Sequence, residues 1–432
     1  MNLEFFIARK VAGTGSNGFS RIIINIAIAA IALSMTVMIC ATALIHGFKK
    51  EITSKIFGFW GHIHVNDINL NNTFESIPVD KDQTFYPGLD SIGRVEYSGK
   101  PMYYNFIGGE GIKMKSSKGG IDHIQIFALK EGIIKNEKPE GIILKGVWDD
   151  FKWDFLEQYF KAGRKINFPD STMSRDILIS RSTANRLEID VDDQLTIFFV
   201  RNNQQLQRRF KVCGIYQTGL EEYDKRFALV DIRQIQKLQD WSNDQVSGFE
   251  VFLDDLDDLN VFHAYINEEI LPTKLYAETI RYKFPGIFEW LELQNINEVV
   301  IISLMLIVSI INMITALMIL ILERTNMIGT LKALGHSDWG IRRIFLYYAA
   351  YIVVIGLLLG NLIGISICFL QKKFSIIKLR EEDYYLDVAP IDLDFWTIML
   401  LNFGTLLITL IFLLIPSYLV TKISPLKAIR FK

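Results

Sequence analysis

Cysteine is scarce in this chain of 432 residues, which contains three. Cys40 and Cys368 lie inside long uncharged runs, and Cys213 stands alone in the polar segment between the first two runs. A single cysteine cannot form a disulfide within its own segment. Any domain in that segment therefore has to fold on its apolar core.

Signatures of common enzyme classes are also missing. The chain has no Gly-x-Ser-x-Gly elbow and no His-Glu-x-x-His pair. The glycine-rich segment Gly108–Lys113 lacks the spacing of a Walker loop, which needs four residues between its first glycine and the Gly-Lys-Ser/Thr triplet. We interpret it as a hairpin or exposed loop, and we predict no catalytic residue and no nucleic-acid partner.

Two groups of residues resemble metal ligands only in part. His62 and His64 share one face of a predicted strand, but no third ligand stands at a recognisable spacing, which favours an ordinary strand pair. The acidic run Asp254–Asp258 lacks the glycine and the terminal glutamate of a calcium loop. It indicates a solvated turn and a helix N-terminus, and we predict no metal site.

Asp, Glu, Lys and Arg are absent from four long runs. About 20 residues in a helix cross the apolar layer of a membrane, and a membrane span has to satisfy its own backbone groups, so each run predicts a transmembrane helix. No ionisable residue lies in the middle of a run, which argues against an ion-coupled transporter. The energy for any transport is therefore expected from a partner. The runs are Ile22–Gly47, Val299–Leu322, Ile344–Gln371 and Phe395–Thr421.

The alternative for the first run is a cleaved signal peptide. Such a peptide has an apolar part of about 7 to 15 residues followed by a small-residue cleavage site. The first run is longer than this and leads into the basic segment His46–Lys50. A retained helix is the better interpretation.

These runs predict a membrane α-helical protein in which a large mixed α/β extracytoplasmic domain is inserted between helices 1 and 2. Lys and Arg concentrate in the N-terminal segment, in the connection between the second and third runs, and in the C-terminal tail. This pattern places those three segments on the cytoplasmic side of the membrane. The predicted segments are a cytoplasmic or interfacial 1–21, helix 1 at 22–47, the domain at 48–298, helix 2 at 299–322, a cytoplasmic connection at 323–343, helix 3 at 344–371, an extracytoplasmic loop at 372–394, helix 4 at 395–421 and a cytoplasmic tail at 422–432.

Alternating or β-rich stretches predict five strands in the domain, and helical spacing predicts two helices there. A further helix is expected to run from Tyr282 to Glu298 into the second span. The predicted strands are His62–Val65, Ile124–Phe127, Leu195–Val200, Phe210–Ile215 and Phe249–Leu253, and the helices are Ser180–Leu187 and Ile232–Leu238.

The connection between the second and third spans predicts a short helix. Ile328, Leu331 and Leu334 recur at near-helical spacing, and Gly335 suits a left-handed C-cap. Ser337 and Asp338 then start the next helix. A short helix rigidly joined to two spans is a good lever, but a simple connection lying on the lipid surface remains an equal alternative.

This connection resembles the coupling helix of the FtsX/MacB/LolC-LolE permease superfamily, which sits in a groove of an ATPase subunit. The resemblance rests on Glu323-Arg324, Ile328-Gly329 and Leu331–Gly335. It implies that the residues contacting the ATPase are Glu323, Arg324, Ile328, Gly329, Leu331, Lys332, Ala333, Leu334 and Gly335.

Further segments are similar to the lipoprotein-releasing LolC/LolE branch. Two features depart from it: His46 stands where that branch usually has Asn, and Asn66–Glu140 matches loosely. The similar segments are Phe6–Arg9, Gly47–Glu51, Gly58-Phe59, His62-Ile63, Gly214–Tyr216, Gly219, Tyr223-Asp224, Tyr385, Pro390, Pro416-Ser417 and Pro425–Ala428.

The resemblance implies the permease subunit of an ABC transporter in the inner membrane, with a MacB-like periplasmic core domain. Cytoplasmic LolD-like ATPases would bind ATP and Mg, while this chain binds no cofactor directly. A second permease subunit, identical or similar, would complete the pair. ATP-driven closure would be transmitted mechanically to extract a lipoprotein from the membrane lipid and pass it to a LolA-like periplasmic carrier. A MacB-like efflux permease and an FtsX-like regulator of cell-wall hydrolases are the alternatives.

A path for the lipoprotein is sought between the first two spans. Each buried methylene of an acyl chain contributes about 0.8 kcal/mol to membrane anchoring, so extraction needs an apolar cavity as well as energy. Ile31, Met35 and Met38 recur at helical spacing, and Met305 lies on the second span. Flexible Met side chains fit varied acyl chains, although ordinary core packing explains the same pattern.

The topology is tested by cysteine labelling in a cysteine-free background. We expect a membrane-impermeant reagent added outside spheroplasts to modify a cysteine at Asn203 and to spare one at Thr330. Labelling of both positions, or of Thr330 alone, would reverse the assigned orientation.

Overall fold

The structure is a computed structural model that describes residues 4, 6–7, 18–69, 77–98, 114–135, 139–169, 172–201, 204–380 and 384–423. These residues form two compact units. The helical unit comprises Met1–Glu51, Glu289–Lys378 and Val388–Lys432, and the α/β unit comprises Ile52–Phe288 and Leu379–Asp387.

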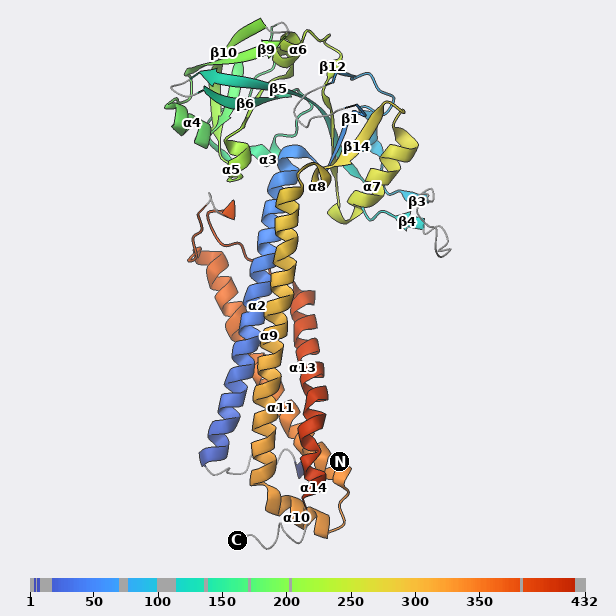
Figure 1. The fold of residues 1–432 in the computed structure, drawn as a ribbon, viewed down its shortest axis with the longest axis vertical. Coiled ribbons are helices and arrows are strands. Elements are labelled where there is room, and N and C mark those ends of the chain that lie inside the picture. The colour runs from blue at the N-terminus through green and yellow to red at the C-terminus, as the bar shows by residue number, and fades with distance from the viewer. Residues whose placement is uncertain are drawn as a thin grey trace. The chain divides into compact units, whose positions relative to one another are not determined.

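Four long helices contain the four uncharged runs (Figure 1). They are α2 (Gly18–Trp60), α9 (Pro285–Glu323), α11 (Asp338–Phe374) and α13 (Phe395–Ser417), and the short α14 (Leu419–Lys422) follows α13. All four are long and apolar enough to cross a membrane. Short α10 (Thr325–Ala333) connects α9 to α11.

Two of these helices extend well beyond their apolar runs. The first does not end at Gly47 but continues to Trp60, and α9 begins at Pro285 rather than at Val299. At about 1.5 Å per residue, each extension adds roughly 20 Å of helix. Close to the points where the two extensions begin, Lys49 Nζ on α2 donates a hydrogen bond of 3.1 Å to Asn295 Oδ1 on α9. There, His46 Nε2 lies 3.4 Å from Glu298 Oε1.

Helix α2 packs against α11 through three glycines spaced four residues apart. A Cβ at Gly360 would lie 2.7 Å from the Cβ of Met35 and 2.7 Å from the Ala32 carbonyl oxygen. Gly356 and Gly364 meet α2 in the same way. Such small residues let two helix backbones approach closely, which is how helices associate where lipid removes the hydrophobic driving force.

The α/β unit contains a ten-stranded sheet. Nine of its strands follow the order β14-β1-β13-β5-β6-β11-β8-β10-β7, and the tenth, β9, pairs with β10 and β5. The 15-residue β5 belongs to both halves of this sheet. The strands are β1 (Ile63–Asp67), β5 (Ile121–Lys135), β6 (Pro139–Val147), β7 (Phe160–Gly163), β8 (Asp176–Ser180), β9 (Gln194–Arg201), β10 (Gln204–Tyr216), β11 (Phe227–Asp231), β13 (Gly248–Leu253) and β14 (Leu275–Thr279).

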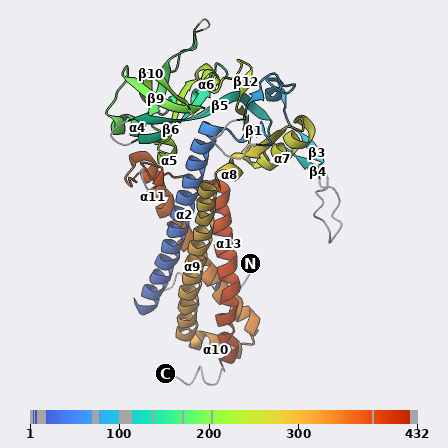
Figure 2. The ribbon, with the colours of Figure 1, turned by 45° about the horizontal axis from the view of Figure 1, so that its top comes forward.

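Part of this sheet closes on itself (Figure 2). Strand β5 pairs with β6, β6 with β11, β11 with β8, β8 with β10, β10 with β9, and β9 again with β5. Closure removes unpaired strand edges within the ring. The strand registers place Ile177, Ile197, Phe210 and Val230 on the same face of these strands, and all four side chains are fully buried.

Short elements complete the unit. Three of the α-helices begin with a side-chain cap: Ser180 Oγ accepts from Thr183 N at α4, Asp231 from Arg233 N at α6, and Thr279 from Tyr282 N at α8. The elements are β2 (Val79–Asp80), β3 (Glu96–Ser98), β4 (Met114–Ser116), β12 (Gln245–Val246), α3 (Asp154–Glu157), α4 (Arg181–Leu187), α5 (Glu221–Asp224), α6 (Ile232–Gln239), α7 (Leu259–Tyr265), α8 (Ile280–Lys283), η1 (Gly88–Ser91), η2 (Leu256–Asp258) and η3 (Ile266–Ile270).

The predicted strands and helices all coincide with elements of the structure. The five strand stretches fall in β1, β5, β9, β10 and β13, and the two helical stretches fall in α4 and α6. The segment Gly108–Lys113 lies outside the described residues. In the ten-stranded sheet, β6, β7, β8, β11 and β14 were not predicted.

Candidate functional site

The predicted coupling segment forms the short helix α10, which connects α9 to α11. Helix α10 begins at Thr325, and the chain leaves it through Gly335, whose φ of +85° is left-handed, as its sequence position predicts. Ser337 Oγ then accepts from Gly340 N and caps α11. The connection therefore has little freedom to bend, and α10 is held between two long helices.

Residues of α10 divide into an inner and an outer set. Ile328 and Gly329 are buried, Leu331 and Lys332 are half-buried, and Arg324 is half-buried just ahead of the helix. Glu323, Thr330, Ala333, Leu334 and Gly335 are exposed, and the Leu334 side chain has 79% of its surface accessible. An exposed leucine at the end of a short helix is a ready contact for a partner. The outer set, and not Gly329, is therefore available to an ATPase.

Lys332 links α10 to the C-terminal end of α14. Its Nζ donates to the carbonyl oxygens of Thr421 at 3.2 Å and Ile423 at 3.0 Å, and it lies 2.8 Å from Asp338 Oδ1. Backbone carbonyls at a helix C-terminus attract cations. The role of Lys332 here is internal: it binds α10 to α14 and to the start of α11.

The residues predicted for the lipoprotein path lie inside the helical unit. Ile31, Met35 and Met38 are fully buried, and Met35 packs against Gly360 of α11. Met305 on α9 is half-buried. A different face of each helix is exposed. On α2 the exposed large apolar side chains are Ile22, Ile26 and Leu33, and on α9 they include Leu304, Ile307, Val308 and Ile311.

A buried ionic cluster holds the end of α2 inside the α/β unit. Lys145 on β6 and Glu250 on β13 are fully buried, with Lys145 Nζ 2.8 Å from Glu250 Oε1. The same Nζ donates to the Phe59 carbonyl oxygen at 2.5 Å and lies 4.8 Å from the centre of the Trp60 ring. Phe59 belongs to the last turn of α2, whose carbonyls have no partner within the helix. Lys145 therefore both caps the C-terminus of α2 and forms an ion pair with Glu250.

His64 completes this cap from β1. Its Nε2 lies 2.7 Å from the Trp60 carbonyl oxygen, and its Nδ1 lies 3.0 Å from Nζ of Lys283 on α8. Burial and the Lys283 ammonium lower the pKa of His64 to about 4. The imidazole is therefore neutral at pH 7, with Nε2 donating to Trp60 and Nδ1 accepting from Lys283. The cluster thus joins the end of α2 to the short helix that precedes α9.

Burial alone would raise the pKa of Glu250, but the Lys145 ammonium and the His64 imidazole outweigh it and hold this pKa below its ordinary value. Glu250 Oε2 also accepts from Gln125 Nε2 at 2.6 Å. The carboxylate is therefore ionised, paired and hydrogen-bonded, as a buried charge has to be.

The weak metal-site candidates have protein partners. His62 Nδ1 accepts from Leu253 N at 2.9 Å, and burial lowers the pKa of His62 to about 4. In the acidic run, Asp258 accepts from the backbone of Lys118 and Gly119, and Asp255 caps η2. Within the described residues no group of three or more potential metal ligands occurs.

A basic hollow of about 880 Å³ opens on the α/β unit between α6, the start of β8 and the β9–β10 pair. Four of its lining residues are cations: Arg175, Arg208, Arg209 and Lys237. Within the described part of the chain none of them has an acidic partner at ion-pair distance, and no acidic residue lines the hollow. The hollow therefore favours an anionic ligand or surface.

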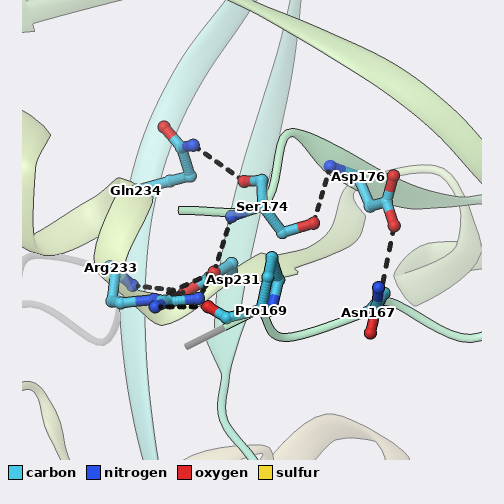
Figure 3. Close-up of polar contacts among 7 residues, drawn as sticks. All are labelled: Asn167, Pro169, Ser174, Asp176, Asp231, Arg233 and Gln234. Atoms are coloured by element: carbon cyan, nitrogen blue, oxygen red, sulfur yellow. Dashed lines mark hydrogen bonds and ion pairs between the residues drawn. The ribbon is translucent and has the colours of Figure 1, made fainter. Parts of the chain in front are cut away.

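Hydrogen bonds from α6 fix one wall of this hollow (Figure 3). Gln234 Nε2 donates to the Ser174 carbonyl oxygen at 2.8 Å, and Ser174 N donates to buried Asp231 at 2.9 Å. Arg233 forms an ion pair of 2.7 Å with Asp231 and donates to the Pro169 carbonyl oxygen at 3.0 Å. The loop that carries Arg175 is thereby preorganised.

Sequence reasoning missed both the ionic cluster and the basic hollow. Lys145 lies in an apolar stretch of β6 and Glu250 is the single charge of β13, a pattern that indicates pairing but does not identify the partner. The Arg208-Arg209 pair on a strand is the one local signal for the hollow. Its other cations come from segments far away in the chain.

Known proteins match this chain along its whole length. The family described as FtsX-like permease C-terminal matches residues 299–425. The lipoprotein-releasing system transmembrane protein LolC of Xylella fastidiosa is 23% identical, over 96% of this chain and 95% of that protein. LolC of Neisseria meningitidis is 22% identical over 100% of both chains, and LolE of Haemophilus influenzae is 22% identical over 98% of both.

Among solved structures, the periplasmic region of MacB from Actinobacillus actinomycetemcomitans is similar at 13% identity. The match covers 38% of this chain and 77% of that one, with a TM-score of 0.28.

The ionic cluster generates a stability prediction. Lys145→Met leaves Glu250 buried without its cation, which we expect to cost about 3–5 kcal/mol of unfolding free energy. Replacing both residues, as Lys145→Met with Glu250→Leu, should recover much of this loss because no charge then stays buried. Denaturant unfolding of the detergent-purified chain, followed by tryptophan fluorescence, measures the difference.

The matched control for this test is Lys152→Met. Lys152 pairs with Asp122 at a partly exposed position, so its removal should cost about 0–1 kcal/mol. A Lys145→Met variant no less stable than this control would show that the cluster does not anchor α2.

Proposed function

We propose that this chain, a permease of the LolC/LolE type, uses ATP hydrolysed by a partner subunit to extract lipoproteins from the inner membrane. The full-length similarity to LolC and LolE supports this function over a MacB-like efflux permease or an FtsX-like regulator. The chain acts as a transporter subunit without catalytic residues of its own. It pairs with a second permease subunit, and the α/β unit lies in the periplasm.

Helix continuity is the observation that carries the proposal. Helix α10 is joined to α9 at Arg324 and to α11 by the short capped turn 334–337, and both α2 and α9 continue from the apolar runs into extensions of roughly 20 Å. Long unbroken helices carry displacement without bending when their ends are held. The end of α2 is held by Lys145 and His64. Closure of two ATPases on the α10 helices would therefore reach the α/β unit.

The exposed apolar faces of α2 and α9 form the acyl-chain path in this proposal. Leu33 on α2 and Leu304 and Ile311 on α9 each have more than half of their surface accessible. This path differs from the one predicted at Ile31, Met35 and Met38, whose side chains are fully buried. Acyl chains bound to these faces would stay in apolar surroundings until the helices move.

The basic hollow serves in this proposal as the docking surface for the periplasmic carrier. Four unpaired cations around a preorganised loop attract an acidic surface and orient it as it approaches. Attraction of this kind raises the rate of encounter more than it raises the final affinity, which suits a carrier that has to leave again.

The proposed function is tested in proteoliposomes that contain the chain with its ATPase and second permease subunit. We expect ATP to release a triacylated lipoprotein into a solution of the carrier. Leu334→Glu places a charge on the exposed end of α10, so release should fall by at least about tenfold while folding stays intact. Ile68→Glu is the control, because it charges another exposed aliphatic residue, in the α/β unit.

Lipoprotein release in the absence of ATP would refute the proposed energy source. Full release by Leu334→Glu would refute the assigned contact with the ATPase.

Docking of the carrier is tested by charge reversal in the hollow. Arg209→Glu combined with Lys237→Glu should slow transfer to the carrier by about tenfold, while ATP hydrolysis is retained. In the unchanged protein, transfer should slow as ionic strength rises, because salt screens exposed charges. Lys161→Glu, on β7 away from the hollow, is the control. Equal transfer rates in all three proteins would remove the hollow from the path.

A further inference from the structure

The connection between α11 and α13 belongs to both compact units. We call residues 375–394 the strap; the structure describes it apart from 381–383. Its central part, Leu379–Asp387, belongs to the α/β unit, while the residues on either side belong to the helical unit. Two backbone pairs hold its arms together: Leu379 N donates to the Asp387 carbonyl at 2.8 Å, and Ala389 N donates to the Ile377 carbonyl at 3.1 Å.

Within the helical unit the strap is fastened to α11 and α2. Buried Gln371, near the end of α11, donates to the carbonyl oxygens of Ile377 and Ala389 and accepts from Ile377 N at 2.9 Å. Asp392 N donates to the Ala43 carbonyl of α2 at 3.0 Å, and the Asp392 carboxylate pairs with Lys50 at 3.1 Å.

Gly47 of α2 allows this fastening. A Cβ at Gly47 would stand 2.5 Å from the Pro390 carbonyl oxygen, a distance that backbone atoms cannot tolerate. The strap therefore lies directly on the backbone of α2. Glycine is required at this position by close approach, and not by the conformation of the helix.

Within the α/β unit the centre of the strap is fastened to one turn. Lys55 Nζ, from the last part of α2, donates to the Tyr385 carbonyl oxygen at 3.2 Å. A Cβ at Gly219 would lie 2.9 Å from the same oxygen, and Gly219 has a φ of +80°. The strap again lies on a glycine backbone.

Buried Asp224 makes this turn rigid. Its carboxylate accepts from Thr218 N at 3.0 Å, from Thr218 Oγ1 at 2.7 Å and from Gly219 N at 3.1 Å. Burial raises the pKa of Asp224 to about 6, against the effect of these hydrogen bonds. At pH 7 the carboxylate is ionised and holds Gly219 under the strap.

We propose that the strap is a second mechanical link to the α/β unit, through which movement of α10 and α11 drives that unit during lipoprotein release. This inference rests on the proposed function. Helix α11 starts four residues after Leu334 and carries the strap at its far end, so a displacement of α10 reaches the strap through one helix. The strap, which rests on α2 at Gly47, then acts on the turn at Gly219.

The test uses the complete complex in proteoliposomes and two variants that lift the strap. Gly47→Ala displaces it from α2, and Gly219→Ala displaces it from the turn. Alanine favours helix more than glycine does, so Gly47→Ala does not weaken α2 itself. We expect lipoprotein released per ATP hydrolysed to fall by about tenfold in each variant, with the ATPase rate nearly unchanged. Hydrogen exchange of the Asp392 and Leu379 amides should rise.

Two further variants serve this test. Gly404→Ala in α13 is the matched control, because a Cβ there meets no atom within 4 Å. Lys55→Met removes the donor to Tyr385 without adding bulk, and it replaces either glycine variant that fails to fold; we expect the same loss of coupling from it.

The proposal is overturned if the glycine variants release lipoprotein per ATP as the unchanged protein does, or if release and ATPase rate fall together. If the unchanged complex releases no lipoprotein, the proposed function has failed on its own. In that case the strap is tested by the ATP-dependent change in hydrogen exchange of residues 216–224. Gly47→Ala should abolish this change, and Gly404→Ala should preserve it. Equal exchange changes in both would overturn the link.

Discussion

The fold depends on a charge pair that water does not reach. Lys145 and Glu250 lie on strands that are not neighbours, and their contact places an ammonium group under the last carbonyls of α2. Separately, each charge would be strongly unfavourable in the interior. Together, and with His64 and Gln125, they fix where a helix that begins in the membrane has to end. An apolar contact would bury similar area without specifying this position.

The helical unit shows the opposite solution. Its interior is apolar, and its specificity comes from shape: Gly356, Gly360 and Gly364 form a shallow surface on α11 that receives Ile31 and Met35. A few hydrogen bonds supplement this packing, such as that from Thr36 Oγ1 to the Gly360 carbonyl and the pair between Asn361 and Asn402. Among the described residues of the helical unit, no charged side chain is fully buried.

The sequence predicts the membrane helices well because a span is recorded locally, as a run of uncharged residues. It does not predict that α2 continues to Trp60, since Lys49, Lys50 and Glu51 resemble the start of a polar domain. Strands β9 and β10 were predicted from their β-rich composition, whereas β6, which carries a lysine into the core, was not. Local patterns identify elements, and only the folded chain shows which polar residue inside them has a partner.

The candidate site shows the same division. Helical spacing correctly groups Ile31, Met35 and Met38 on one face, but it cannot tell that α11 covers that face. For Gly335 the sequence was sufficient, because a left-handed C-cap is a property of the residue itself. For Gly47 and Gly219 the sequence shows glycines, and the reason for them lies in Pro390 and Tyr385, more than 150 positions away.

The closed ring of strands determines how the α/β unit responds to load. Through Lys145, any pull on α2 would reach β6, which has β5 on one side and β11 on the other. A strand at an open edge peels away one hydrogen bond at a time. A strand held on both sides has to slide past its two neighbours and break both ladders together. In the proposed mechanism the unit would therefore move as a rigid body under a force that would unzip an open sheet, and little of the ATPase stroke would be lost in stretching it.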